Sequence, residues 1–227
     1  SGGKLKEWSE RLNVPLIVVP GGSQQRDALP YLLLPIVVCL QKLGAGNFEN
    51  DLREAVEMPE KIDLKSLDEV ANKLKSAEVA IYGSDDFAGV VRRFKNEFNE
   101  NSKMVVKWGT FPELSHNEIN GYQRTDLNGR AGVIFLRDKN EADEMKVRFE
   151  VTKEILSEYV NSLHEIWSVG ESKLAKIVGF SYMAAYITAK IAELVGVNRE
   201  RVIFVEKLKD ELKNRLNLVE KLEKNLF

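Results

Sequence analysis

Hydrophobic residues in this chain fall into short unbroken runs separated by longer stretches with helical spacing. The unbroken runs predict strands over residues 15–19, 78–82, 104–108, 131–136 and 164–169. Strands without polar alternation are buried on both faces, which is typical of a parallel sheet covered by helices. The pattern therefore predicts an α/β protein.

Apolar residues three and four positions apart predict helices between these strands. They cover residues 4–12, 28–43, 63–76, 87–98, 142–156 and 174–195, with a further helix opening near residue 116 and a charged amphipathic helix or pair of helices over 201–227. Pro30 falls in the first turn of its helix, and Pro35 predicts a kink. Residues 44–59 are polar and predicted to be irregular.

The order of strand, loop and helix starts again at residue 78, which places a domain boundary near residue 76. We expect three parts: residues 1–76, residues 77–200, and a helical segment over 201–227. The simplest architecture is two doubly wound parallel-sheet domains, with the first lacking its opening strands and ending in a linker helix.

Composition narrows the classes of partner. The chain has 227 residues, 44% of them hydrophobic, and 33 Lys and Arg against 35 Asp and Glu, giving a net charge of −2. Because both signs are scattered, no basic stripe favours nucleic acid, and a small molecule or another subunit is the expected partner. No apolar run reaches the ~18 residues of a membrane span, and no signal-peptide pattern opens the chain, so we expect a cytoplasmic protein. A single cysteine, Cys39, excludes a disulfide framework and is predicted to be buried.

Polar and acidic residues are concentrated over residues 96–122, around Glu100 and His116. One interpretation is a solvated surface. However, a carboxylate at a helix C-terminus and a histidine at a helix start both oppose the helix dipole, so the placement costs stability unless function requires it. The pattern alone leaves both interpretations open. His164 has no motif around it and is predicted to be structural.

Several segments resemble one known family in their order along the chain. They are NENSK at 99–103, FPELSHNEI at 111–119, GSQQRDALP at 22–30, GESKLAK at 170–176 and LKDEL at 208–212. Together they resemble the bifunctional phosphoglucose/phosphomannose isomerases, which consist of two sugar-isomerase (SIS) domains. The resemblance extends over nearly the whole chain and implies that both predicted domains are of the SIS type.

The resemblance implies isomerisation of aldose and ketose 6-phosphates, such as glucose and fructose 6-phosphate, through a cis-enediol without metal or cofactor. Glu100 matches the base that moves the proton between adjacent carbons, and His116 matches the group that opens the sugar ring. In the family this histidine comes from the neighbouring subunit, which implies a homodimer with shared active sites. Arg26 matches a residue suited to stabilising the enediolate, although without the resemblance an exposed loop arginine is the simpler interpretation. Lys209 matches a late lysine that reaches the sugar, with Lys207, Lys213 and Lys221 as nearby alternatives.

Two departures from the family qualify this expectation. No segment matches its Ser/Thr-rich phosphate loop, so the sequence is expected to be an N-terminally incomplete version. Residues 83–86 have the right position for such a loop, but Asp85 and Asp86 would repel a phosphate dianion and are predicted to be helix caps. Residues 198–200 are Asn-Arg-Glu where the family often has Asp-Pro-Thr, so conversion of mannose 6-phosphate is less supported than that of glucose 6-phosphate.

Two other functional hypotheses remain. The missing phosphate loop would suit a non-catalytic SIS module that binds sugar phosphates or serves as a subunit. A metal-dependent isomerase is disfavoured, because the two histidines lack the spacing of metal ligands.

Overall fold

Four parallel strands form one sheet in this computed structural model, which describes residues 3–124 and 129–226. The strands are β1 (Glu78–Ser84), β2 (Lys107–Phe111), β3 (Ala131–Arg137) and β4 (Ser162–Trp167), in the order β2-β1-β3-β4. Ile81 of β1 stands opposite Trp108 of β2 and Ile134 of β3. The predicted α/β class and the parallel sheet are confirmed.

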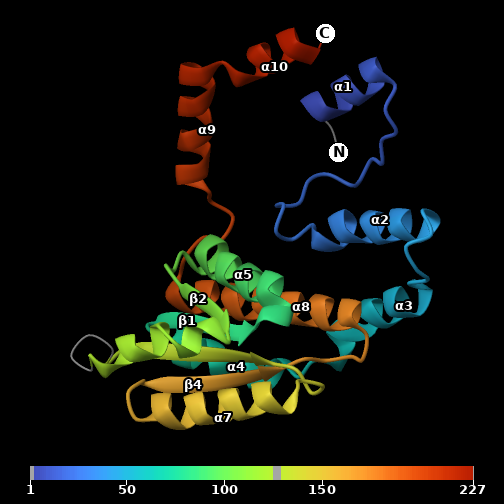
Figure 1. Cartoon of the computed structure of the whole chain (residues 1–227). Helices are drawn as coiled ribbons and strands as arrows, with labels where there is room; N and C mark the ends of the chain where they lie inside the picture. Colours follow the sequence, from blue (N-terminus) through green and yellow to red (C-terminus); the bar gives the residue numbers. More distant parts are fainter. Residues whose placement is uncertain (1–2, 125–128, 227) are drawn as a thin grey trace.

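Helices cover both faces of this sheet, because the strands carry apolar residues on both sides. Val79, Ile81 and Ile134 point into one core with the helices α4 (Leu64–Leu74), α5 (Ala88–Glu97) and α8 (Lys173–Val195). Ala80, Val133 and Phe135 point into a second core with α7 (Asp143–Ser157). Figure 1 shows α7 on one side of the sheet and α5 and α8 on the other. This is the doubly wound arrangement that unbroken apolar strands favour.

Two of the predicted strands are displaced along the chain, and a third does not form. Strand β2 begins three residues later than predicted and β4 two residues earlier. Residues 15–19 have no strand pairing, and the Ile17 side chain is 57% exposed, so this prediction is wrong. A strand needs the N–H and C=O groups of a neighbour, and among the described residues none pairs with this segment.

The segment 44–59, predicted to be irregular, contains the helix α3 (Glu49–Glu57) and the start of the short helix η1 (Met58–Lys61). Glu49 and Asp51 lie in the first turn of α3, where negative charge stabilises a helix. Ala55 and Met58 are buried against Ala175 of α8. Tertiary packing therefore gives this polar stretch its helical structure.

Helix α4 packs in the same core as the sheet, although it precedes residue 76. Leu67, Ala71 and Leu74 are buried there together with Ile81. We refer to residues 49–197 as the sheet body. The domain boundary near residue 76 stays a prediction.

Outside the sheet body lie α1 (Lys4–Leu12), α2 (Leu29–Lys42), α9 (Ile203–Leu216) and α10 (Leu218–Leu226), which we call the terminal helices. The predicted C-terminal helix is a pair, because the chain turns at Asn217 in the left-handed conformation. Trp8 of α1 donates a hydrogen bond of 3.2 Å to Glu223 of α10, so the two ends of the chain meet (Figure 1).

The terminal helices bury little of their apolar surface. In α1, α9 and α10 no described residue is buried, and in α2 only Val37 is. Cys39, predicted to be buried, is only partly buried, because α2 has few neighbours. Across residues 3–124 and 129–226, no helix is both long and hydrophobic enough to cross a membrane.

Candidate active site

Glu100 lies in a π turn, η3 (Phe98–Ser102), that extends α5 beyond Glu97. Lys103 ends the turn in the left-handed conformation, and its N–H donates to the carbonyl of Phe98. The wider turn buries Phe98, Asn101 and Ser102 while the Glu100 side chain stays 50% exposed. Turns of this kind occur often at functional sites. The end of α5 thus presents the Glu100 carboxylate to solvent, while the polar residues Asn101 and Ser102 next to it are buried.

Arg26 lies in the loop before α2 and is only 7% exposed. Its Nε donates to Asn101 Oδ1 at 2.7 Å, and its Nη2 donates to the carbonyl of Arg199 at 2.8 Å. Its Nη1 lies 3.4 Å from Glu100 Oε2. The interpretation as an exposed loop arginine is therefore wrong, and the structure places Arg26 beside Glu100.

A cleft of about 290 Å³ opens where these two side chains meet. Three guanidinium groups and two carboxylates line it, from the residues Gln25, Arg26, Gly89, Arg92, Arg93, Asn96, Glu97 and Glu100. No atom lies within 4 Å of the position that a Cβ on Gly89 would occupy, so this wall of the cleft is open. The cleft has the charge and size to accept a small anionic ligand.

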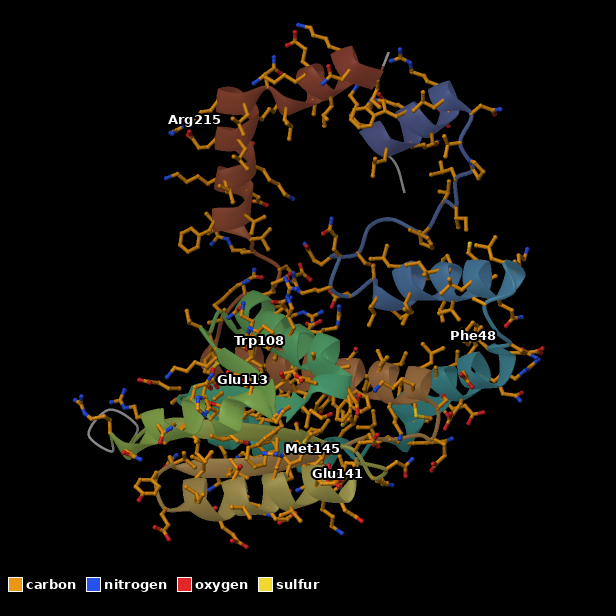
Figure 2. The ribbon with its side chains drawn as sticks, in the orientation of Figure 1. Phe48, Trp108, Glu113, Glu141, Met145 and Arg215 are labelled. Carbon is orange, nitrogen blue, oxygen red and sulfur yellow. The ribbon has the colours of Figure 1, made fainter. Side chains whose placement is uncertain are left out.

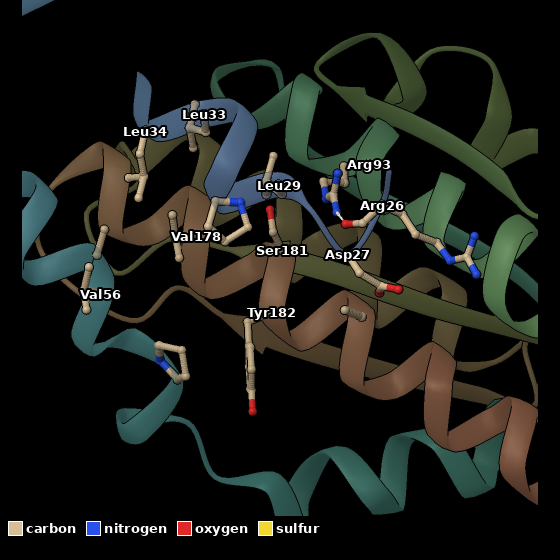
Figure 3. Close-up of a pocket in the computed structure, with 14 residues that line it drawn as sticks. Arg26, Asp27, Leu29, Leu33, Leu34, Val56, Arg93, Val178, Ser181 and Tyr182 are labelled. Atoms are coloured by element: carbon tan, nitrogen blue, oxygen red, sulfur yellow. Dashed lines mark hydrogen bonds between the residues drawn. The ribbon is translucent and has the colours of Figure 1, made fainter. Parts of the chain in front are cut away.

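A second cavity, of about 350 Å³, lies on the other side of Arg26, between α2 and α8 (Figure 3). Arg26, Asp27 and Arg93 lie at one end of it, and most of the remaining lining is apolar, including Leu29, Leu33, Leu34, Val56 and Val178. The apolar lining makes this cavity a poor match for a sugar phosphate. Arg26 thus separates a polar cleft from an apolar cavity.

Burial and charge act on the ionisable groups under the cleft. Burial raises the pKa of the Glu97 carboxyl above its usual range, the nearby Glu100 adds to this, and the Arg93 guanidinium acts in the opposite direction. Burial also lowers the pKa of the Lys103 ammonium, and Arg26 contributes to that shift. Glu97 is therefore a buried carboxyl among charged neighbours that act on its pKa in opposite directions, while Lys103 is exposed at the edge of the same group.

His116 and Lys209 lie outside this cleft. His116 follows the short helix η4 (Glu113–Ser115) and is exposed, and its carbonyl accepts from Asn120 Nδ2 at 3.1 Å. Lys209 is exposed on α9, which extends away from the sheet body (Figure 1). The structure thus brings Arg26 and Glu100 together, and within the part of the chain that it describes neither His116 nor Lys209 joins them.

The segment 83–86 differs from its prediction. β1 continues to Ser84, and Asp85–Phe87 forms a short 3-10 turn, η2. The N-cap of α5 is Phe87, without a side-chain cap, so the prediction that Asp85 and Asp86 cap this helix is wrong. The intervening 3-10 turn moves both aspartates away from the cap position.

The residues that hold Arg26 were not predicted from the sequence. Arg93, Glu97 and Asn101 follow one another at intervals of four residues, so they share one helix face, and this spacing could have indicated a network. No pattern in the sequence connects them to Arg26 or to Thr188 of α8. Among the described residues no group of three or more His, Cys, Asp or Glu side chains is placed to hold a metal ion.

Comparison with known proteins adds a family context to this site. Residues 65–212 match the family model described as the bacterial phospho-glucose isomerase C-terminal SIS domain. The chain is 30% identical to a bifunctional phosphoglucose/phosphomannose isomerase of Caldicellulosiruptor bescii and 27% identical to a D-glucosamine-6-phosphate 4-epimerase of Sulfolobus acidocaldarius. The alignments cover 93% and 95% of this chain, and the chain spans 66% of the length of each relative.

A solved structure has a similar fold. The hypothetical protein TT0462 of Thermus thermophilus aligns with 95% of this chain and 61% of its own, with a TM-score of 0.76 and 15% sequence identity. At this identity the likeness concerns the fold alone.

Proposed function

This chain belongs to the family of bifunctional phosphoglucose/phosphomannose isomerases, and on that premise we propose that it isomerises hexose 6-phosphates between aldose and ketose. Glucose 6-phosphate and fructose 6-phosphate are the first proposed pair, and mannose 6-phosphate is a further substrate. The observation that carries the proposal is the placement of the buried Arg26 guanidinium beside the half-exposed Glu100 carboxylate, at the edge of a polar cleft.

Glu100 is the proposed base. It takes a proton from C2 of the opened aldose, which gives a cis-enediolate with its negative charge on the C1 oxygen. The proton of the C2 hydroxyl then moves to the C1 oxygen, and Glu100 returns its proton to C1 as the C2 carbonyl forms, which gives the ketose. Its half-exposed carboxylate at the cleft is open to a substrate, and the buried layer beneath it fixes the turn that carries it. The proton transfer needs no redox partner, because hydrogen leaves one carbon and returns to the next.

Arg26 is the proposed electrostatic partner of the enediolate. A guanidinium stays charged at any working pH and donates in a fixed plane, so it can stabilise negative charge that develops on adjacent oxygens. Its Nε is already bonded to Asn101 and its Nη2 to the Arg199 carbonyl. The third nitrogen, Nη1, lies beside Glu100 at the cleft. We expect Nη1 to be the atom that meets the substrate.

His116 and Lys209 complete the proposed site from outside this cleft. We propose that His116 of a neighbouring subunit opens the sugar ring, so that a homodimer shares its active sites. The exposure of His116 supports this, because an exposed side chain is available to a partner. Lys209 is proposed to reach the sugar, which requires that α9 approach a cleft.

The test supplies fructose 6-phosphate and follows glucose 6-phosphate with a coupled dehydrogenase. Glu100→Gln keeps the shape of the side chain but removes the base, and we expect kcat to fall by roughly 10²–10⁴-fold. Glu154→Gln, at an exposed carboxylate on α7, is the matched control and should leave kcat unchanged. Full activity of Glu100→Gln would contradict the assignment of the base, and loss of activity with a chelator would contradict the metal-free mechanism.

Two alternatives would give different results. A non-catalytic sugar-phosphate-binding module would show a thermal shift with hexose 6-phosphates but no turnover. An epimerase is favoured by the name of the S. acidocaldarius relative. In that case, incubation with D-glucosamine 6-phosphate would produce the C4 epimer in an NMR spectrum, while fructose 6-phosphate would remain unchanged.

A further inference from the structure

A fully buried polar network lies beneath Arg26 and has no role in the proton transfer. Its members Glu97 and Asn101 come from the end of α5 and the π turn, and Thr188 comes from α8. Asn101 is 0% exposed. Buried polar side chains destabilise a core unless their hydrogen bonds are made, and all three side chains are bonded here. Such a network fixes one arrangement of its members.

The hydrogen bonds determine the orientation of the Asn101 amide. The Thr188 hydroxyl donates to the carbonyl of Ala184 at 2.8 Å, so its oxygen can only accept from Asn101. Asn101 Nδ2 donates to that oxygen at 2.9 Å and to Glu97 Oε2 at 2.8 Å. Both amide hydrogens are therefore used, and the amide oxygen must face Arg26 Nε, which it meets at 2.7 Å. An inverted amide would place its oxygen against two acceptors.

Arg93 ties the same network to the backbone of Arg26. Its Nη2 donates to the Arg26 carbonyl at 2.7 Å, which Figure 3 shows as a dashed line, and to Glu97 Oε1 at 2.6 Å. Glu97 thus accepts from Arg93 with one oxygen and from Asn101 with the other. The backbone and the guanidinium of Arg26 are held by the same carboxylate through two different neighbours.

The contact between Arg26 and Glu100 is long for a pair of opposite charges. It joins one nitrogen and one oxygen at 3.4 Å, whereas charge-assisted hydrogen bonds are usually about 2.7–2.9 Å and arginine often binds a carboxylate through two of them. The other nitrogens cannot turn toward Glu100, because Nε is bonded to Asn101 and Nη2 to the Arg199 carbonyl. The network thus holds the Arg26 guanidinium next to the Glu100 carboxylate without allowing a two-point ion pair between them.

We propose that Asn101, oriented by Glu97 and Thr188, is a positioning residue that keeps Arg26 from closing into a two-point ion pair with Glu100. This inference rests on the proposed function, in which Glu100 must accept a proton and Arg26 must meet the enediolate. If the pair closed, Glu100 would be occupied and Arg26 would be turned away from the substrate. Asn101 acts through Arg26 and does not touch the substrate.

The first experiment compares Asn101→Ala with the wild-type chain by NMR. The Arg26 Nε–H signal, assigned by its absence in Arg26→Lys, should be protected from solvent exchange in the wild type. In Asn101→Ala it should change its chemical shift if Nε bonds to Glu100, or lose its protection if only the two terminal nitrogens do. The matched control is Asn72→Ala, which removes a side-chain hydrogen bond to the carbonyl of Asp68 on α4 and should leave the signal unchanged. A signal that keeps both its chemical shift and its protection in Asn101→Ala would overturn the proposal.

The second experiment measures kcat and KM of the same variants with fructose 6-phosphate. A hydrogen bond to a charged group is worth about a tenfold or larger effect, and we expect the loss in Asn101→Ala to appear mainly in kcat. Thr188→Val keeps the volume of the side chain and removes only one anchor of the amide, so it should fold if Asn101→Ala does not and should show a smaller loss of kcat. Wild-type kcat in both folded variants would overturn the inference. An inactive wild-type protein would overturn the proposed function, and the NMR signal would still decide whether Asn101 holds Arg26.

Discussion

Residues 131–137 and residues 15–19 are both unbroken apolar runs, but they have different structures. In β3 all seven residues are buried, with β1 on one side and β4 on the other. Residues 15–19 are extended without a paired strand and leave Ile17 57% exposed. The sheet body likewise buries its apolar residues, whereas the terminal helices leave most of theirs exposed. An apolar run specifies that a segment needs a partner, and only the fold decides whether that partner is present.

The largest expected effect concerns charge. Arg137 at the end of β3 is 0% exposed and is bonded to Glu141, Glu150 and Glu165. Arg137→Met would take the paired cation from Glu141 and leave Glu150 and Glu165 only Lys153, so we expect the free energy of unfolding to fall by about 3–5 kcal/mol in urea titrations.

The matched variant is Arg215→Met on the terminal helix α9, whose guanidinium also pairs with a glutamate four residues away (Figure 2). This pair is solvent-exposed, so the urea midpoint should not change measurably. A loss at Arg215 as large as that at Arg137 would show that α9 is buried against another surface in solution.

A smaller effect is expected from apolar side chains. Ile134→Ala in β3 removes part of a fully buried side chain and should lower the free energy of unfolding by about 2–5 kcal/mol. Ile17→Ala is the same substitution in the unpaired segment and should leave the urea midpoint unchanged. Equal losses at the two positions would mean that residues 15–19 are covered in the protein in solution.

The smallest effect should depend on pH. Burial lowers the pKa of His164 in β4, and the charge of Lys73 adds to this. As the pH falls, the imidazole of His164 is therefore protonated at a higher pH in the unfolded chain than in the folded one. The stability of the folded chain is greatest above the ordinary histidine pKa of about 6.5, and this contribution is lost as the pH falls through the folded pKa. Urea midpoints should decrease from pH 7.5 to pH 5, and His164→Asn should reduce that slope.

The other histidine in the chain provides the control for this measurement. His116 is exposed, so His116→Asn should leave the slope unchanged. An unchanged slope in His164→Asn would contradict the assigned role of His164.

Much of the sheet body was predictable from the sequence. The runs that became β1 and β3, and the helical spacing of α4, α7 and α8, agree with the structure within a few residues, because these segments bury their apolar residues locally. The shifted limits of β2 and β4 were not predictable, since their ends depend on which neighbouring strand they pair with. Helix α3 was missed because its stability comes from packing on α8.

The candidate site, too, was predictable only in part. Motifs identified Arg26 and Glu100 as separate candidates, and the family membership that they indicated is confirmed. The catalytic roles of Glu100, Arg26, His116 and Lys209 all stay predictions.

The sequence by itself determined the α/β class, the parallel sheet and the residue types available for proton transfer, because burial patterns and motifs are local properties of a chain. Only the tertiary structure decided that Arg26 is buried beside Glu100 and that its Nε donates to Asn101. These contacts join residues about 75 positions apart and depend on the π turn at the end of α5 and on its packing against α8. Hydrogen-bond direction in a buried network is set by all its members at once, so no single segment of the sequence specifies it.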